Sequence, residues 1–324
     1  MPADPPSGAP RARRTGHRGL LGAACAAAAA VVALVVFAVS CGGPGGGGSG
    51  GGDGGGDGAP RPPGASASAP ASPTPEWDTS PDSLAALGDS ITRAFDACSL
   101  LADCPEASWA TGTSPEVDSL ARRLGVPAGA RWNLARSGAL MAELPAQARR
   151  AAARRPDLVT VLVGANDACR PTVGRMTPVE EFRADFAEAL RVLRASSPGT
   201  QVFVASLPDL ERLWSVGRAH PLAAQVWKLG ICPSMLGGAS PDASGSAAAE
   251  RRGKVAERVR AYNAALAEVC ARDARCRHDG GAVHAYRFTA RELSTWDWFH
   301  PGREGQRRLA GIAHRVVASV RPPS

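Results

Sequence analysis

The sequence lacks the motifs that mark two common classes of binding protein. None of its eight cysteines forms a C-x-x-C pair and its six histidines are scattered, so no pattern indicates a zinc site. The formal net charge is +7, but the arginines form no single run with interleaved aromatic residues, and part of the excess lies near the N-terminus. We therefore expect no metal, no cofactor and no nucleic-acid partner.

Large hydrophobic side chains are absent from residues 42–76, which consist mainly of glycine, proline, serine and alanine. A segment of this composition cannot bury enough apolar surface to offset the entropy cost of folding, so we expect a flexible to semi-extended tether. The remaining chain, residues 77–324, is long enough to form one domain with a sizeable hydrophobic core.

The N-terminal segment, residues 1–41, has the organisation of an export signal. Four arginines precede an apolar run over residues 20–40, which at about 20 residues is long enough to span a bilayer. The run ends at Cys41 and resembles a bacterial lipoprotein signal, with the small Ser40 before the cysteine but Ala38 where leucine is usual. A lipidated Cys41 and an uncleaved membrane anchor both stay open. Either places the domain outside the cytoplasmic membrane, tethered to it or secreted.

Six cysteines follow the N-terminal segment, and an even number in an oxidising compartment indicates disulfides. Two pairs would each close a short loop, which leaves one further pair. The expected disulfides are Cys98–Cys104, Cys270–Cys276 and Cys169–Cys232.

Apolar runs alternate with helical patterns along residues 77–324. Strands are expected over residues 83–88, 131–135, 157–164 and 201–207. Helices are expected over residues 115–124, 144–154, 178–196, 250–272 and 303–320. This alternation predicts an α/β fold in which helices cover both faces of a parallel sheet. Residues 208–249, rich in small residues and proline, are expected to cross the active-site side of that sheet.

Polar residues follow the ends of the expected strands. The stretch "ALGDSITRAF" places Ser90 after the first strand, where a serine could cap a helix or serve as a nucleophile. Gly138 lies in "NLARSGA" and Asn166 in "GAND", and "DWFHP" places Asp297 and His300 before the last helix. Because open parallel sheets bind ligands outside the carboxyl ends of their strands, we expect these residues to gather at one edge.

With these blocks in this order, the sequence resembles the GDSL or SGNH hydrolases. The resemblance implies a flavodoxin-like three-layer α/β/α fold and a carboxylic ester hydrolase. It also implies Ser90 as nucleophile, His300 as the base that activates it and Asp297 as the residue that orients His300. The implied oxyanion hole consists of the backbone N–H groups of Ser90 and Gly138 and the side-chain amide of Asn166.

Finer features resemble the phospholipase B-like or secreted actinobacterial lipase-esterase branch of that family, namely "SWATG" and the cysteine in "VGANDAC". Ile91 replaces the leucine that is usual in the first block. This resemblance implies a small-molecule or lipid ester as substrate, and we expect the protein to be a monomer. Two other functions stay open: a carbohydrate O-deacetylase of the same fold and a non-catalytic cell-surface binding module.

Apolar residues near the expected sheet edge are candidates for an acyl-binding surface, although the same residues could be ordinary core. These candidates are Trp109, Leu140, Met141, Leu207, Leu210, Trp214, Trp227, Met235 and Leu236.

Overall fold

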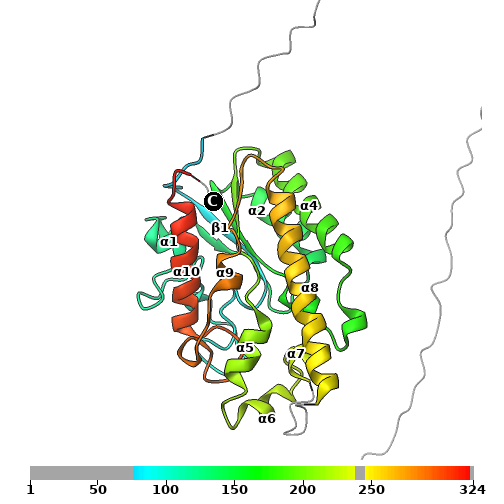
Figure 1. Cartoon of the computed structure of the whole chain (residues 1–324). Coiled ribbons are helices and arrows are strands. Elements are labelled where there is room, and N and C mark those ends of the chain that lie inside the picture. The colour runs from blue at the N-terminus through cyan, green and yellow to red at the C-terminus, as the bar shows by residue number, and fades with distance from the viewer. Residues whose placement is uncertain (1–75, 238–244, 322–324) are drawn as a thin grey trace, which may run out of the picture. The chain divides into compact units, whose positions relative to one another are not determined.

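The computed structural model describes residues 76–237 and 245–321 (Figure 1). The predicted export segment over residues 1–41, with Cys41, lies outside these ranges, as does the predicted tether over residues 42–76 except Glu76. Within the two described ranges, no helix has both the length and the hydropathy that a membrane span requires.

One sheet of five parallel strands lies at the centre of the described residues, in the order β2-β1-β3-β4-β5. The strands are β1 (Leu84–Gly88), β2 (Arg131–Asn133), β3 (Leu158–Leu162), β4 (Gln201–Val204) and β5 (Cys276–His278). Every residue of the neighbouring strands β1 and β3 is buried. Continuous apolar runs of this kind are typical of parallel strands that are covered on both faces.

Helices cover both faces of the sheet, with α4 and α8 on one side and α1 and α10 on the other (Figure 1). The helices are α1 (Leu120–Arg123), α2 (Leu144–Ala152), α3 (Ala165–Ala168), α4 (Val179–Ser196), α5 (Leu210–Gly217), α6 (Ala223–Trp227), α7 (Pro233–Leu236), α8 (Ser246–Cys270), α9 (Ala282–Ala285) and α10 (Arg303–Val317). α4 shows why these segments pack: Phe182, Phe186, Leu190 and Leu193 recur at helical spacing and are buried. The predicted α/β fold is confirmed.

The strand order places a binding crevice at one point of the sheet. In a sheet of order 2-1-3-4-5 the chain moves toward one edge from β1 to β2 and toward the other edge from β3 to β4. Ligands bind where this direction reverses, between β1 and β3, outside the carboxyl ends of the strands. Ser90 follows β1 and Asn166 follows β3, so both residues lie at this crevice.

Within residues 76–237 and 245–321 the structure contains five short helices that are not among the predicted elements, namely α3, α5, α6, α7 and α9. It also differs from the prediction at one helix and one strand. The helix expected over residues 115–124 is limited to α1, because Asp118 has a left-handed φ of +49° and Ser119 caps the helix by accepting the Arg122 N–H. β5 is missing from the predicted strands, since its three residues carry no apolar alternation. Its pairing with β4 and the Cys270–Cys276 disulfide hold it in place.

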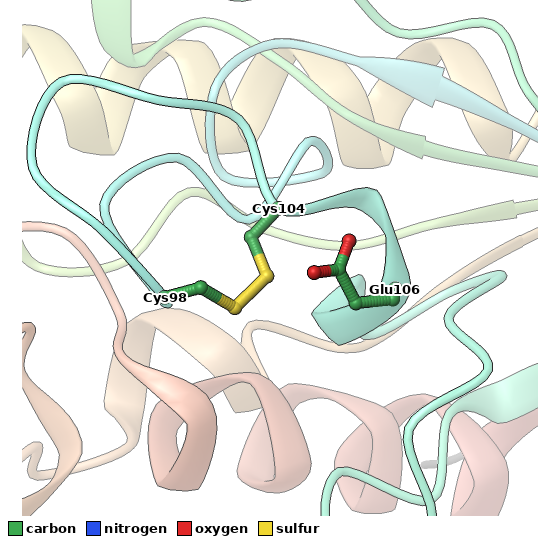
Figure 2. Close-up of side chains that lie close together, drawn as sticks. All are labelled: Cys98, Cys104 and Glu106. Carbon is green, nitrogen blue, oxygen red and sulfur yellow. A yellow bond between two sulfur atoms is a disulfide. The ribbon is translucent and has the colours of Figure 1, made fainter.

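The described residues contain three disulfides with the predicted pairing. These are Cys98–Cys104, Cys169–Cys232 and Cys270–Cys276, with Cα–Cα distances of 5.9, 4.2 and 5.2 Å. Figure 2 shows the first of them beside the carboxylate of Glu106. Because its two sulfur atoms are bonded to each other, neither is a thiolate that could join Glu106 in holding a metal.

Candidate active site

A tight turn at the end of β1 presents Ser90. Gly88 has a φ of +151°, and a Cβ at this position would lie 2.3 Å from the carbonyl oxygen of Leu162, so the strand can approach β3 only with glycine here. In the following turn the Asp89 carboxylate accepts a hydrogen bond of 3.0 Å from the Ile91 N–H. Ser90 is 7% exposed and lines a cavity.

Gln147, a buried residue of α2, fixes the last residue of β1 from the side. Its Nε2 donates to the Gly88 carbonyl oxygen at 2.9 Å and its Oε1 accepts from the Gly88 N–H at 2.8 Å. Sequence analysis does not identify this residue as part of the site. The available signal is a glutamine on the otherwise apolar buried face of α2.

The structure brings Ser90, His300 and Asp297 together in the predicted order. Ser90 Oγ lies 3.1 Å from His300 Nε2, and His300 Nδ1 is hydrogen-bonded to Asp297 Oδ2. The residues that follow Ser90 form turns and not a helix, so Ser90 is not a helix cap. A hydroxyl beside one ring nitrogen and a carboxylate on the other is the arrangement that activates a serine as nucleophile.

The loop that carries Asp297 and His300 is held by backbone groups and by a distant tryptophan. Asp297 Oδ1 accepts the N–H groups of Phe299 and His300, each at 2.9 Å. The Ser294 N–H donates to the His300 carbonyl oxygen at 2.8 Å. Trp227 Nε1 of α6 donates to the Asp297 carbonyl oxygen at 2.7 Å. These contacts fix the histidine relative to the sheet.

The charges around His300 favour its protonated form. Burial lowers the proton affinity of His300, but Asp297, with smaller contributions from Asp96 and Asp89, raises its pKa above the ordinary value. Burial likewise disfavours an ionised Asp297, but His300 holds the pKa of Asp297 below its ordinary value. Asp297 is therefore a carboxylate at neutral pH, and His300 is a stronger base than an isolated histidine.

Gly138 and Asn166 line the same cavity as Ser90. Gly138 has a left-handed φ of +79°, and Asn166 Nδ2 donates to the Ala139 carbonyl oxygen at 3.1 Å. Asp167 links the two segments further, because its Oδ2 accepts the Met141 N–H at 2.9 Å. Sequence analysis does not identify Asp167, whose position directly after Asn166 is the only available signal.

The cavity has a volume of about 250 Å³. Its polar lining residues are Ser90, Ser137, Asn166 and His300, and the rest of its wall is mainly apolar. The apolar wall consists of Ile91, Phe95, Ala165, Leu210, Leu213, Ile231, Phe299, Pro301 and the Cys169–Cys232 disulfide. Pockets for drug-sized ligands occupy roughly 300–1,000 Å³, so this cavity suits a small apolar group.

Of the apolar residues predicted to form an acyl-binding surface, Leu210 is the one that lines this cavity. For most of the others the core interpretation is correct, because they are buried away from it. The fully buried ones are Trp109, Met141, Leu207, Trp227, Met235 and Leu236, whereas Leu140 and Trp214 are half-buried. The segment over residues 208–249 nevertheless reaches the site, since it supplies Leu210, Leu213, Gly230, Ile231 and Cys232.

A family model described as GDSL-like Lipase/Acylhydrolase matches residues 84–312. No curated protein sequence matches the chain. Among solved structures, the chain is similar to LAE5, an alpha/beta hydrolase enzyme from the metagenome of Lake Arreo, Spain, at 17% identity and a TM-score of 0.46, covering 74% of this chain and 96% of that one.

Two further solved structures are similar to the chain at the level of the fold. One is a catalytic mutant of Axe2, an acetylxylan esterase from Geobacillus stearothermophilus, at 17% identity and a TM-score of 0.46, covering 75% of this chain and 97% of that one. The other is the psychrotrophic esterase EstA from Pseudoalteromonas sp., at 12% identity and a TM-score of 0.41, covering 72% and 95%.

Proposed function

The chain belongs to the GDSL-like lipase/acylhydrolase family, and on that premise we propose that it is an extracytoplasmic serine esterase or lipase whose catalytic residues are Ser90, Asp297 and His300. The observation that carries the proposal is the 3.1 Å contact between Ser90 Oγ and His300 Nε2 at the wall of a largely apolar cavity.

In the first half of the reaction, Ser90 Oγ attacks the carbonyl carbon of the acyl group and its proton passes to His300 Nε2. Asp297 keeps its charge and stabilises the imidazolium that forms. His300 then gives the proton to the leaving alkoxide, and the alcohol departs from an acyl-Ser90 intermediate. In the second half, His300 takes a proton from water and the resulting hydroxide attacks the acyl carbon. His300 then gives this proton to Ser90 Oγ as the bond between Oγ and the acyl carbon breaks, and the carboxylic acid leaves.

The negative oxygen of each tetrahedral intermediate needs donors that are already in place. The N–H groups of Ser90 and Gly138 and the side chain of Asn166 are the proposed donors, since all three residues line the cavity with the nucleophile. The Asn166 amide carries two N–H groups. One is hydrogen-bonded to the Ala139 carbonyl oxygen, and the other serves the oxyanion.

The acyl part of the substrate is a chain longer than acetyl, as in a phospholipase B-like enzyme that releases fatty acid from a phospholipid or an acylglycerol. Phe95, Leu213 and Ile231 support this proposal, because they give the cavity a wall that a chain of several methylenes could contact. Each buried methylene contributes about 0.8 kcal/mol, or roughly fourfold in kcat/KM.

The test is a series of p-nitrophenyl esters from acetate to octanoate, with kcat/KM measured for the full-length protein. We expect kcat/KM to rise from acetate to butyrate and to stay well above the acetate value through octanoate. Ile231→Trp reduces the space in the cavity and is expected to shift the preference back to acetate. Leu229→Trp is the matched control, since Leu229 is 67% exposed and is not part of the cavity wall.

Hydrolysis of acetate esters alone by the wild type would contradict the acyl-chain proposal and support the carbohydrate O-deacetylase. Failure to hydrolyse any ester, with the fold intact, would support the non-catalytic binding module.

The place of action follows from the N-terminal segment. Export of the domain is supported by a basic stretch that is followed by an apolar run over residues 20–40. Attachment to the membrane, through a lipidated Cys41 or an uncleaved anchor, is supported by the length of that run and by the tether over residues 42–76. On this proposal the enzyme meets its ester substrates outside the cytoplasmic membrane.

A further inference from the structure

Asp96 connects the two parts of the active site. It lies in the loop after β1, has a left-handed φ of +58° and is fully buried. Its N–H donates to the Ala102 carbonyl oxygen at 2.9 Å. Its own carbonyl oxygen accepts the Ser294 hydroxyl at 2.6 Å, and Ser294 belongs to the loop that carries His300.

The carboxyl group of Asp96 lies close to Asp297 and His300, the acidic and basic groups of that loop. One oxygen of Asp96, one of Asp297 and a ring nitrogen of His300 all lie within 4.8 Å of one another. Asp96 Oδ1 accepts the Leu101 N–H, whereas Oδ2 is buried and has no hydrogen-bond donor among residues 76–237 and 245–321. An unpaired buried carboxylate oxygen is costly, so its position beside the ionisable pair requires an explanation.

From this placement we infer that Asp96 is a positioning residue which, through its carboxylate beside Asp297, stabilises the protonated form of His300. The inference rests on the proposed function, in which that protonated form arises when Ser90 gives up its proton. Asp96 itself makes and breaks no covalent bond: the proton moves from Ser90 Oγ to His300 Nε2, and Asp96 and Asp297 keep their charges.

The electrostatics agree with this role. Burial and the neighbouring Asp297 raise the pKa of Asp96 to about 6, and His300 opposes the rise. Above that pH Asp96 is ionised, and its charge adds to that of Asp297 in raising the pKa of His300. Burial raises the pKa of Asp89 to about 7, so the charge of Asp89 contributes only at higher pH. Three acidic groups act on His300. Asp297 belongs to the same loop as His300, Asp96 lies in the loop after β1, and Asp89 directly follows the last residue of β1.

The variant Asp96→Asn removes the charge with little other change. Asparagine keeps an oxygen for the Leu101 N–H and tolerates the left-handed backbone. Asp118→Asn is the matched control, because Asp118 also has a left-handed φ, of +49°, but forms surface ion pairs with Arg122 and Arg123.

The first readout is the pKa of His300, followed by NMR of its ring protons in the full-length protein and assigned with His300→Asn. We expect Asp96→Asn to lower this pKa by about one unit and Asp118→Asn to leave it unchanged. In the wild type the same signals should show a second inflection near pH 6 from ionisation of Asp96, separate from the one near pH 7 that comes from Asp89, whose pKa burial raises to about 7. This wild-type measurement tests the inference even if Asp96→Asn does not fold.

The second readout is the pH dependence of ester hydrolysis. In Asp96→Asn the acid limb of kcat/KM should move to lower pH by the same amount, and kcat on the plateau should fall about tenfold with little change in KM. An unchanged or increased His300 pKa in folded Asp96→Asn, or a wild-type titration without the second inflection, overturns the inference. A wild type that hydrolyses no ester overturns the proposed function instead, and the NMR titration still decides the role of Asp96.

Discussion

The two halves of the active site are positioned by different kinds of structure. Ser90 lies in the turn after β1, and Asn166 lies in α3, the short helix after β3. β1 and β3 are buried strands that pair along their whole length, from Leu84 opposite Leu158 to Gly88 opposite Leu162. His300 and Asp297 lie in a loop before α10, where one isolated bridge joins Leu293 to Pro301. The nucleophile is therefore placed by a regular hydrogen-bonded ladder, whereas the base is placed by a few separate contacts, among them the backbone hydrogen bond from Ser294 to His300 and the Trp227 side chain.

The groups that hold the loop come from distant parts of the sequence. The Trp227 side chain, which donates to the Asp297 carbonyl oxygen, is 70 residues from Asp297. The backbone carbonyl oxygen of Asp96, which accepts the Ser294 hydroxyl, is 198 residues from Ser294. The comparison teaches that the sheet half tolerates the loss of single contacts better than the loop half does. Four substitutions follow in order of decreasing effect: the first two test the catalytic roles within the sheet half, and the last two, one in each half, test this statement.

The largest effect is expected from Ser90→Ala, which removes the nucleophile and leaves the ladder intact. We expect kcat to fall by about 10³-fold or more, with an unchanged melting temperature, because Ser90 carries the hydroxyl that His300 Nε2 contacts. Ser215→Ala on the exposed face of α5 is the control, since the Ser215 hydroxyl bonds only to the Arg212 carbonyl oxygen of its own helix among the described residues. Substantial turnover by a folded Ser90→Ala protein would refute the mechanism.

Asn166→Ala is expected to have the second largest effect. Loss of one oxyanion donor typically lowers kcat by about 10²–10³-fold. The same change removes the hydrogen bond to the Ala139 carbonyl oxygen, at a cost of about 1 kcal/mol in stability. Steady-state kinetics should therefore show a reduced kcat with a similar KM, and thermal unfolding a small decrease. A KM effect without a kcat effect would make Asn166 a binding residue and not an oxyanion donor.

The sequence predicts the sheet half well, because it depends on local patterns. Apolar runs mark β1 and β3, and the polar residues after them include Ser90 and Asn166. The spacing of Asp297 and His300 places both in one turn before a helix. Supporting residues such as Gln147 and Trp227 are not predictable in this way, because their roles depend on which helix packs against which strand or loop. The apolar wall is predicted poorly for the same reason: burial in the core and exposure to a cavity look alike in a sequence.

The smallest effects are expected from substitutions of two buried tryptophans, one in each half. In the loop half, Trp227 Nε1 donates to the Asp297 carbonyl oxygen at 2.7 Å. In the sheet half, Trp109 Nε1 donates at 3.3 Å to the hydroxyl of Thr92, which lies two residues after Ser90. Replacement of either by phenylalanine removes one buried donor and some packing, so each variant should lose about 1–3 kcal/mol of stability.

The two variants should differ in kcat. Trp227→Phe leaves the Asp297 carbonyl oxygen without its donor, so the loop gains freedom and kcat should fall about tenfold, since small displacements of a catalytic base are costly. Trp109→Phe should change kcat less than threefold, because Gln147 and the β1–β3 ladder still hold the chain at Ser90. Measurement of kcat for both variants at a temperature well below either melting point separates positioning from stability. Equal losses of kcat would mean that the ladder gives the nucleophile no advantage over the loop.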